Sequence, residues 1–94
     1  MITVDVLLIQ MPLVRPADLE RWIANDWVRP DGRPGGYAFH DIDVARVRLI
    51  QELRDDLEVD EATLPVVLML LDQLYDLRRR LGDRRGQPGP TAAL

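Results

Sequence analysis

The sequence contains no cysteine and no lysine, it has a single histidine, and no apolar run approaches the length of a membrane-spanning helix. Without cysteine the chain has no disulfide, no thiolate zinc site and no thiol nucleophile. One histidine, His40, excludes a pair of histidine metal ligands and leaves little general acid–base chemistry. We therefore expect a protein that is not an enzyme, with no catalytic, cofactor-binding or metal-binding residues and no small-molecule substrate.

The length of 94 residues allows one domain, which we expect over residues 1–81, followed by a polar tail at 82–94 that we expect to be disordered. A domain this small favours a binding module over a two-lobed enzyme, because it buries only about two-thirds of its unfolded surface. The stretch Ile2–Leu13 has neither a basic segment before it nor a small-residue cleavage site after it. We therefore expect a cytoplasmic protein without membrane association.

Arginine supplies all twelve cations, and the charge is spread unevenly. Residues 1–40 hold four arginines against five acids, residues 41–61 three against eight, and residues 62–94 five against three. The isoelectric point is about 4.8, whereas a DNA-binding domain usually has a basic face and a high isoelectric point. This balance argues against a nucleic-acid partner and favours a basic protein partner.

The first 25 residues predict a strand and then a helix. In this β-branched stretch Ile2, Val4, Val6 and Leu8 alternate with Thr3, Asp5 and Leu7, which indicates a short strand with one buried face that ends before Pro12. Pro16 suits the first position of a helix that runs to about Asn25. Because Pro12 and Pro16 lie so close together, we expect no room for a complete helix ahead of the one that begins at Pro16.

A turn-rich loop follows at Arg29–Gly36. Across it, Trp27–Val28 and Tyr37–Phe39 are expected to pair as a small hairpin, or wing. His40 is expected to connect the wing to the next helix as a structural residue. We expect both tryptophans, Trp22 and Trp27, to be buried in the core.

Asp41 is the expected N-cap of a long helix that ends near Leu57. Its apolar stripe is predicted from Ile42, Ala45, Leu49 and Leu53, widened by Val47, Ile50 and Leu57, with Arg46, Arg48 and Arg54 off the stripe. A tight turn at Asp60–Ala62 is expected next. Pro65 then places the start of the last helix at Leu64, where the ring removes no helical hydrogen bond.

The last helix carries two apolar stripes and is expected to end at Gly82 as the residue after its C-cap. The first stripe, which we call the seam, consists of Val67, Leu70, Leu74, Leu77 and Leu81. The second consists of Leu64, Leu68, Leu71 and Tyr75. Two stripes need two packing partners, and we expect these to be the preceding helix, in antiparallel orientation, and a second copy of the chain in a homodimer.

The order of these elements, together with particular residues, resembles the chaperone modulator CbpM family in the MerR-like winged helix-turn-helix group. The resemblance rests on Leu19–Trp22, Trp27–Pro30, Gly36–Phe39, Asp43–Ile50, Glu52–Leu57 and Leu70–Leu74, and it spans about residues 4–81. It implies a mainly α fold: a winged-helix core with a short N-terminal strand and a small β wing, followed by two longer antiparallel helices. It also implies a bacterial protein that binds and inhibits the J-domain of a DnaJ-like co-chaperone of the CbpA type.

Two residues depart from what DNA-binding members of that group usually have. Glu20 stands where the resemblance places an arginine of the recognition helix, and Tyr37 stands where it places an arginine of the wing. Both differences remove phosphate contacts, and Glu20 would repel the DNA backbone. A MerR-type DNA-binding regulator is therefore the alternative function, and a small dimeric adaptor with another partner is a third.

The acidic residues are the candidate partner-binding site. The J-domain surface that engages DnaK is basic, so the resemblance suggests that opposite charge steers binding. The candidates are Asp55, Asp56, Glu58, Asp60 and Glu61 before the last helix, with Asp72 and Asp76 on it. These acids have an alternative role that involves no partner. The first five could simply form a turn exposed to solvent, and Asp72 and Asp76 a solvent-exposed edge of the helix.

Overall fold

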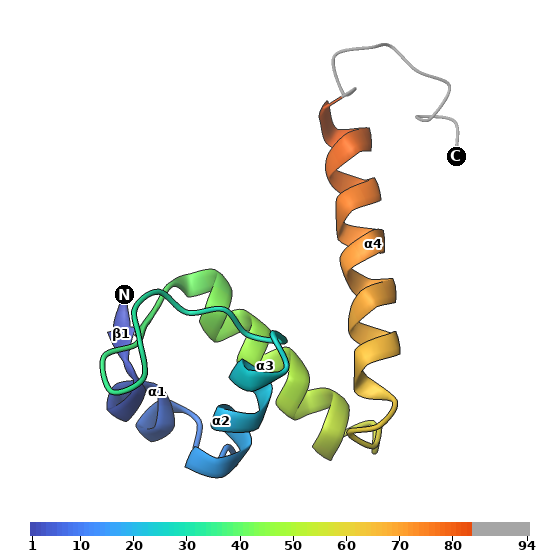
Figure 1. The fold of residues 1–94 in the computed structure, drawn as a ribbon. Coiled ribbons are helices and arrows are strands. Elements are labelled where there is room, and N and C mark those ends of the chain that lie inside the picture. The colour runs from blue at the N-terminus through green and yellow to red at the C-terminus, as the bar shows by residue number, and fades with distance from the viewer. Residues whose placement is uncertain (84–94) are drawn as a thin grey trace. The chain divides into compact units, whose positions relative to one another are not determined.

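The structure is a computed structural model that describes residues 1–83. The described part is mainly α, with four helices and one short antiparallel sheet of two strands (Figure 1). The elements are β1 (Ile2–Thr3), α1 (Val4–Gln10), α2 (Pro16–Ala24), β2 (Ala38–Phe39), α3 (Asp41–Asp55) and α4 (Leu64–Asp83). The chain divides into two compact units, of which the first ends at Leu64 and the second begins at Pro65.

The strand predicted over Ile2–Leu8 is wrong beyond its first two residues, because α1 replaces it. The Thr3 hydroxyl accepts a hydrogen bond from the Val6 amide at 3.3 Å and so caps the helix. Leu7 and Met11, one helical turn apart, are both buried. This helical pair decides the conformation, and the alternating β-branched residues around it concealed the helical period.

The two prolines separate two helices, contrary to the expectation that they leave no room for one. α1 ends before Pro12, and α2 begins at Pro16, where the missing N–H would have had no helical partner. In the turn between them, the Val14 amide donates to the Met11 carbonyl at 3.1 Å. The first unit therefore contains two short helices joined by a tight turn.

The predicted pairing of Trp27–Val28 with the segment before His40 is also wrong. β2 pairs with β1 instead, and Ile2 lies opposite Phe39. The amides of Trp27 and Val28 are already used, because both donate to the Trp22 carbonyl, at 2.9 and 3.4 Å. These hydrogen bonds satisfy a carbonyl at the C-terminal end of α2, and they leave the amides of Trp27 and Val28 unable to bond to another strand.

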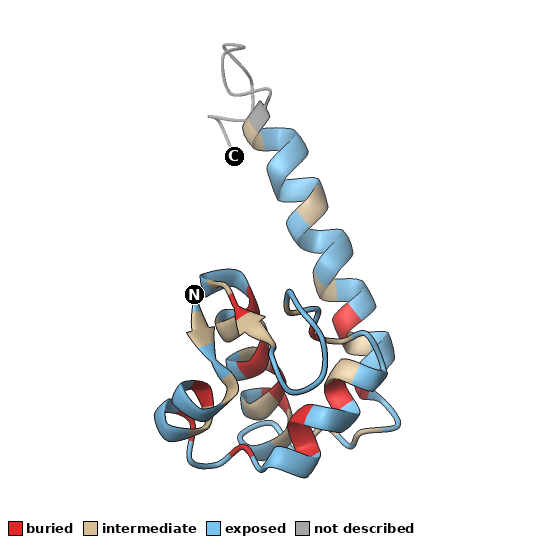
Figure 2. Ribbon diagram, turned by 60° about the vertical axis from the view of Figure 1, so that its left-hand side comes forward, coloured by how far each residue is buried: buried red, intermediate tan, exposed pale blue. Residues whose placement is uncertain are grey.

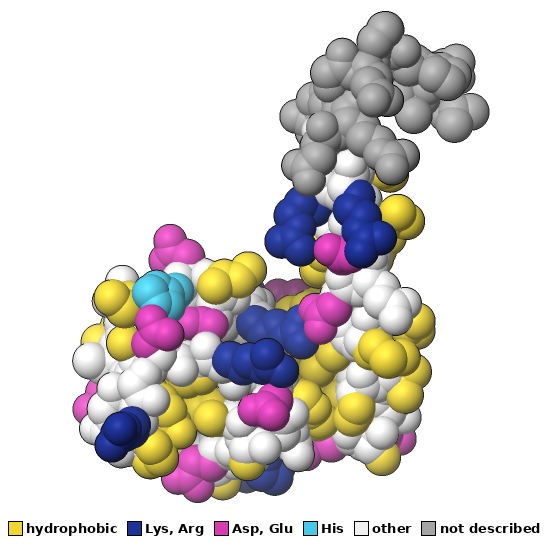
Figure 3. Space-filling view, turned by 45° about the horizontal axis from the view of Figure 1, so that its top comes forward, with side chains coloured by type: hydrophobic (Ala, Val, Ile, Leu, Met, Phe, Trp, Pro, Cys, Tyr) yellow, Lys and Arg dark blue, Asp and Glu magenta, His cyan; other side chains and the backbone are white. Residues whose placement is uncertain are grey.

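The loop before β2 is held by its own backbone and by His40. The backbone amides and carbonyls of Asp31 and Ala38 bond to each other at 2.9 and 3.0 Å. The His40 Nε2 lies 2.5 Å from the Asp31 carboxylate, so His40 links the loop to the start of α3 in the structural role predicted for it. His40 is the cyan side chain in Figure 3. Gly32 has a φ of 92°, and a Cβ there would lie 2.5 Å from the carbonyl oxygen of Gly36.

The same device starts α2 and α3: a carboxylate in the first turn reaches back to the amide before the helix. Asp18 accepts from the Arg15 amide at 3.1 Å, and Asp43 accepts from the His40 amide at 2.9 Å. Both acids are buried. The prediction of Asp41 as N-cap is therefore wrong by one residue, since His40 is the N-cap and Asp41 begins the helix.

The buried stripe of α3 is rotated from the predicted one. Asp43, Val47, Ile50 and Leu53 are buried, whereas Ile42 is 74% exposed. The backbone bond of Asp43 fixes its side chain against the body of the unit, and the residues one turn apart from it follow on the same face. Hydrophobic spacing alone did not show that an aspartate belongs to the buried face.

The core of the first unit is formed by side chains from all of its helices and from β2 (Figure 2). Its buried apolar members are Leu7, Met11, Val14, Leu19, Trp22, Val28, Phe39, Val47, Ile50, Leu53 and Leu64. The prediction for Trp22 is confirmed, and Trp27 is half-buried.

α4 begins at Leu64, as predicted from Pro65. The Asp60 carbonyl accepts from the amides of Thr63 and Leu64, both at 3.1 Å, in the predicted turn. Gly82 does not end the helix, which continues to Asp83. One glycine costs a helix only about 1 kcal/mol, which the leucine-rich turns before it offset. The rest of the predicted tail, residues 84–94, lies outside the described residues.

The seam of α4 is mostly at the surface of the described chain. Leu70, Leu74, Leu77 and Leu81 are exposed, and Val67 is half-buried. Hydrophobic side chains appear at the surface of this helix in Figure 3. The antiparallel arrangement of the last two helices stays a prediction.

Candidate protein-interaction surface

Five of the predicted acidic site residues lie in one short segment of the first unit, which we call the acidic turn: Asp55, Asp56, Glu58, Asp60 and Glu61. Asp55 is the last residue of α3, and the rest follow before α4. The structure does bring them together along the chain, but it gives them different surroundings. Three are bound to neighbouring groups, and two are free.

Asp55 is occupied by its neighbours on α3. Its carboxylate accepts from Arg54 Nε at 2.8 Å and from Gln51 Nε2 at 3.1 Å. The Arg54 guanidinium, followed by the Gln51 amide, lowers the pKa of Asp55. Its charge is largely compensated, so a partner would have to displace Arg54 to use it.

Asp60 and Glu61 are also engaged. The Asp60 carboxylate accepts from the Thr63 amide at 2.8 Å, and the Thr63 hydrogen bonds lower its pKa. Glu61 receives two hydrogen bonds from the Arg21 guanidinium, Nε to Oε2 at 3.1 Å and NH2 to Oε1 at 2.5 Å. This fork-shaped pair lowers the pKa of Glu61 and fastens the turn to α2.

Asp56 and Glu58 are the free members of the acidic turn. Both side chains are exposed, and neither forms a side-chain hydrogen bond or ion pair within the described residues. Glu58 has a φ of 56°, a left-handed conformation that glycine adopts more easily. These two carboxylates are the part of the predicted site that remains available to a partner.

Asp18, which sequence reasoning did not select, is the centre of the ion-pair network beside the turn. Its carboxylate bonds Arg21 NH2 at 2.8 Å and Arg54 NH1 at 2.9 Å. Burial raises the pKa of Asp18, but the hydrogen bonds from Arg15, Arg54 and Arg21 outweigh it, and the pKa is lowered. The i,i+3 spacing of Asp18 and Arg21 was a usable signal, whereas the contact with Arg54 was not visible in the sequence.

Trp22 lies under this network. The Arg54 guanidinium carbon is 5.3 Å from the centroid of the indole ring, a cation–π distance. The indole N–H is fully buried and forms no hydrogen bond of good geometry with the described residues, although the Trp22 side chain helps to lower the pKa of Glu61. The guanidinium therefore contacts α2 twice, through Asp18 and through Trp22.

Internal contacts occupy several of the arginines that a nucleic acid would need. Arg21 and Arg54 are held by carboxylates, which raises the pKa of both groups further above neutrality. Arg46 Nε donates to the Trp27 carbonyl at 2.8 Å. The arginines of the first unit that form no ion pair within the described residues are Arg15, Arg29, Arg33 and Arg48.

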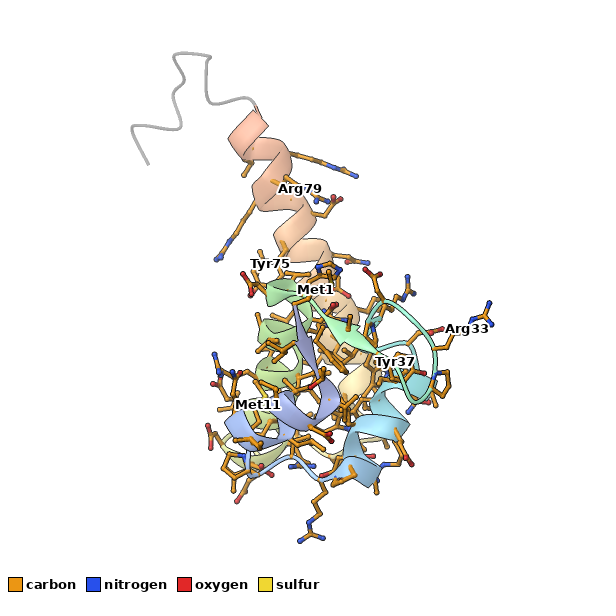
Figure 4. All side chains as sticks on the ribbon, turned by 90° about the vertical axis from the view of Figure 1, so that its left-hand side faces the viewer. Met1, Met11, Arg33, Tyr37, Tyr75 and Arg79 are labelled. Carbon is orange, nitrogen blue, oxygen red and sulfur yellow. The ribbon has the colours of Figure 1, made fainter. Side chains whose placement is uncertain are left out.

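A groove on the first unit lies between α2 and the loop before β2, and we call it the α2–loop groove. Its volume is about 860 Å³, and its walls also include the start of α1. Its apolar lining includes Val4, Leu19, Ile23 and Tyr37. Figure 4 labels Tyr37 and Arg33 on the loop, and the ring of Tyr37 stands edge-on to that of Phe39 at 6.4 Å.

The charged residues that line the groove, among those described, are both acidic: Asp5 on α1 and Glu20 on α2. Glu20 and Tyr37, the two positions where the resemblance places DNA-contacting arginines, therefore share this groove. Sequence reasoning singled them out but did not place them together. The chemistry of the groove is apolar with negative charge.

The acids of α4 belong to the second unit. Asp76 pairs with Arg79 NH2 at 3.0 Å and with Arg80 NH2 at 2.9 Å along the helix, and Asp72 also has an interaction partner. Arg79 and Tyr75 are labelled on this helix in Figure 4. Asp72 and Asp76 are thus less available than their positions in the sequence suggested.

The described residues contain no cluster of three or more groups suited to a metal ion, and no described helix is long and apolar enough to cross a membrane. Comparison of the chain with protein-family models, with curated proteins and with solved structures found no match. The surfaces described above therefore supply the evidence on function.

Proposed function

We propose that the protein is a non-enzymatic binding module that binds and inhibits the J-domain of a DnaJ-like co-chaperone of the CbpA type. The observation that carries the proposal is the pair of free, exposed carboxylates of Asp56 and Glu58 beside a network that neutralises the neighbouring arginines. A surface of this kind attracts a basic protein face. The resemblance to the CbpM family supplies the identity of the partner.

The fold supports the scaffold that this resemblance implies. Two short helices are joined by a tight turn, and the N-terminal strand pairs with a strand that follows a turn-rich loop. This order is compatible with a MerR-like winged helix-turn-helix, which we propose as the specific fold. We also propose that the protein works in the cytoplasm as a homodimer.

Isothermal titration calorimetry with the J-domain of a CbpA-like protein from the same organism tests the function directly. The expected result is a near-stoichiometric complex. The test variant reverses two charges, Asp56→Lys with Glu58→Lys, and the control reverses two exposed charges on α3, Asp41→Lys with Glu52→Lys. The net charge changes equally in both, so only a local role of the turn separates them.

We expect the test variant to bind about tenfold more weakly at low salt, with a smaller loss at high salt, because salt screens exposed charges. The control should keep nearly the wild-type affinity. Absence of heat from the wild-type protein at tens of micromolar would sink the proposed function. Equal losses in the two variants would remove the acidic turn from the site.

The alternative function, a MerR-type DNA-binding regulator, gains two observations from the structure. The helix ahead of α2, which the sequence argued against, is present, and exposed Arg29 and Arg33 lie on the turn-rich loop. Two observations argue against it: Glu20 lies on α2, and Arg21 and Arg54 are both ion-paired with Asp18. Fluorescence anisotropy with duplex DNA at low salt discriminates, since sequence-selective binding with a steep salt dependence would favour the regulator.

A further inference from the structure

The two faces of α2 have different surroundings. Asp18, Arg21 and Trp22 contact one another or the residues of α3 and the acidic turn. Glu20 and Ile23 line the α2–loop groove. At 100° per residue these two sets lie on opposite sides of the helix. The groove is therefore a surface separate from the acidic turn.

The openness of the groove to solvent indicates the size of its occupant. Most of its lining residues are exposed, including Asp5, Glu20 and Ala24, and Leu19 forms its buried floor. Small-molecule sites usually enclose most of the ligand surface. A groove with three surface walls would leave a small molecule largely in water, whereas a polypeptide segment can lie along it and cover it.

The lining indicates the chemistry of that segment. Val4, Ile23 and Tyr37 offer apolar contact, and Asp5 and Glu20 provide negative charge without a cation beside them among the described lining residues. No ion pair of either carboxylate occurs within the described residues, so both charges are available. The complementary ligand presents apolar side chains along one face with lysine or arginine next to them.

We propose that the α2–loop groove docks an amphipathic, basic segment of a partner protein, as a second contact surface for the same binding activity. This inference rests on the proposed function in one respect, namely that the partner is a basic protein. A helix whose apolar residues recur every three or four positions fits such a groove, because it presents them as one ridge.

The test titrates the ¹⁵N-labelled full-length protein with a synthetic amidated peptide that repeats Leu-Lys-Lys-Leu, and follows the amide signals by NMR. We expect saturable shifts concentrated at α2 and at Pro34–Ala38. A peptide that repeats Leu-Glu-Glu-Leu has the same apolar spacing and the opposite charge, and should not bind. Binding of both peptides alike would overturn the charge argument.

Variants locate the site. Glu20→Lys should weaken binding of the basic peptide about fivefold, as expected for one exposed charge pair changed from attraction to repulsion. Ala24→Trp should weaken it by filling the groove from an exposed position. The matched control is Glu52→Lys, which changes another exposed helical glutamate and should leave affinity unchanged.

The double variant Asp56→Lys with Glu58→Lys separates the groove from the acidic turn. If it reduces peptide binding more than Glu20→Lys does, the peptide occupies the turn and the inference is wrong. Since the J-domain is absent from this experiment, a failure of J-domain binding in calorimetry would leave its result unaffected. The two proposals can therefore fail separately.

Discussion

Within residues 1–83, two residues other than glycine have a left-handed backbone: Asp26 with a φ of 61° and Glu58 with a φ of 56°. Each lies just after a helix and allows the chain to turn back. After α2, the Asp26 amide donates to Ile23 at 3.0 Å; after α3, the Val59 amide donates to Leu53 at 2.9 Å. Glycine is the usual residue at such positions, so each side chain is present at some cost in stability.

Replacing either residue with glycine should raise the stability of the fold. We expect about 0.5 kcal/mol for Asp26→Gly and about 1 kcal/mol for Glu58→Gly, because aspartate tolerates the left-handed region better than glutamate. Thermal unfolding should shift upward by several degrees in each case. If Glu58 contacts the J-domain, Glu58→Gly alone should also lose affinity, and Asp26→Gly serves as the control for the stability gain. Unchanged affinity in both would show that Glu58 is only a turn residue.

Two glycines in the turn-rich loop should respond differently to alanine. At Gly32 a new Cβ would lie 2.5 Å from the Gly36 carbonyl oxygen, and φ is 92°. At Gly35 φ is 88°, but nothing lies within 4 Å of the new Cβ. We expect Gly32→Ala to cost about 2 kcal/mol or more and Gly35→Ala about 1 kcal/mol. Chemical denaturation measures both, and equal losses would contradict the close approach at Gly32.

At the scale of elements, α2 is fastened to α3 and the acidic turn by carboxylates whose pKa values are lowered. These are Asp18, which bonds to Arg54 of α3, and Glu61, which bonds to Arg21 of α2. The pKa of Asp55, whose partners lie within α3, is lowered as well. A carboxyl group with a lowered pKa in the folded state stabilises the fold above its unfolded pKa of about 4, and the stabilisation is lost as the pH falls through the folded value. The melting temperature should therefore be steady from neutral pH to about 5 and then fall.

Substitutions assign this acid sensitivity to α2. Asp18→Asn keeps the shape of the side chain but removes the charge from its contacts with Arg21 and Arg54. It should lower stability at neutral pH and flatten the decline below pH 5, because one linked proton is gone. Asp41→Asn, which removes an exposed acid from α3, is the control. An equally steep decline in Asp18→Asn would show that other groups carry the acid sensitivity.

Sequence patterns predicted the elements well where a single residue type fixes the backbone, and less well where two periods compete. Pro16 and Pro65 placed the starts of α2 and α4, because proline restricts its own φ and removes a donor. Over Ile2–Leu8 the β-branched residues alternate, yet Leu7 and Met11 share a helical face and decide the outcome. The competition is settled by tertiary packing, which a short window of sequence does not contain.

The candidate site was predictable in composition but not in availability. The excess of acids before α4 is evident from the sequence. That Glu61 is ion-paired with Arg21, and so is not available to a partner, depends on a contact between residues 40 positions apart. The same applies to Asp18 and Arg54, which are 36 positions apart in the numbering and lie 2.9 Å apart in the fold. Glu20 and Tyr37 meet in one groove for the same reason. Pairings over such distances are fixed by the fold and leave no local spacing to detect.

At the scale of the whole molecule, the exposed seam of α4 predicts that the chain associates with itself. Leu70, Leu74 and Leu77 recur at spacings of four and three, the pattern by which a helix packs along one line against another helix. All three are exposed. Monomeric proteins seldom leave such a continuous apolar stripe in water, so a second copy is its simplest cover.

Analytical ultracentrifugation over a range of concentrations measures this association. The wild-type protein should shift from monomer to dimer as concentration rises, and Leu77→Gln should move the midpoint to a concentration at least about tenfold higher, through lost apolar contact on both copies. Met69→Gln is the control, since Met69 is 51% exposed and Leu77 53%, but Met69 lies about 110° around the helix from the centre of the seam. If the wild-type protein stays monomeric at all concentrations, self-association through the seam is wrong. J-domain binding should then be measured with the seam variant. A partner that packs on these leucines would lose affinity in Leu77→Gln but not in Met69→Gln.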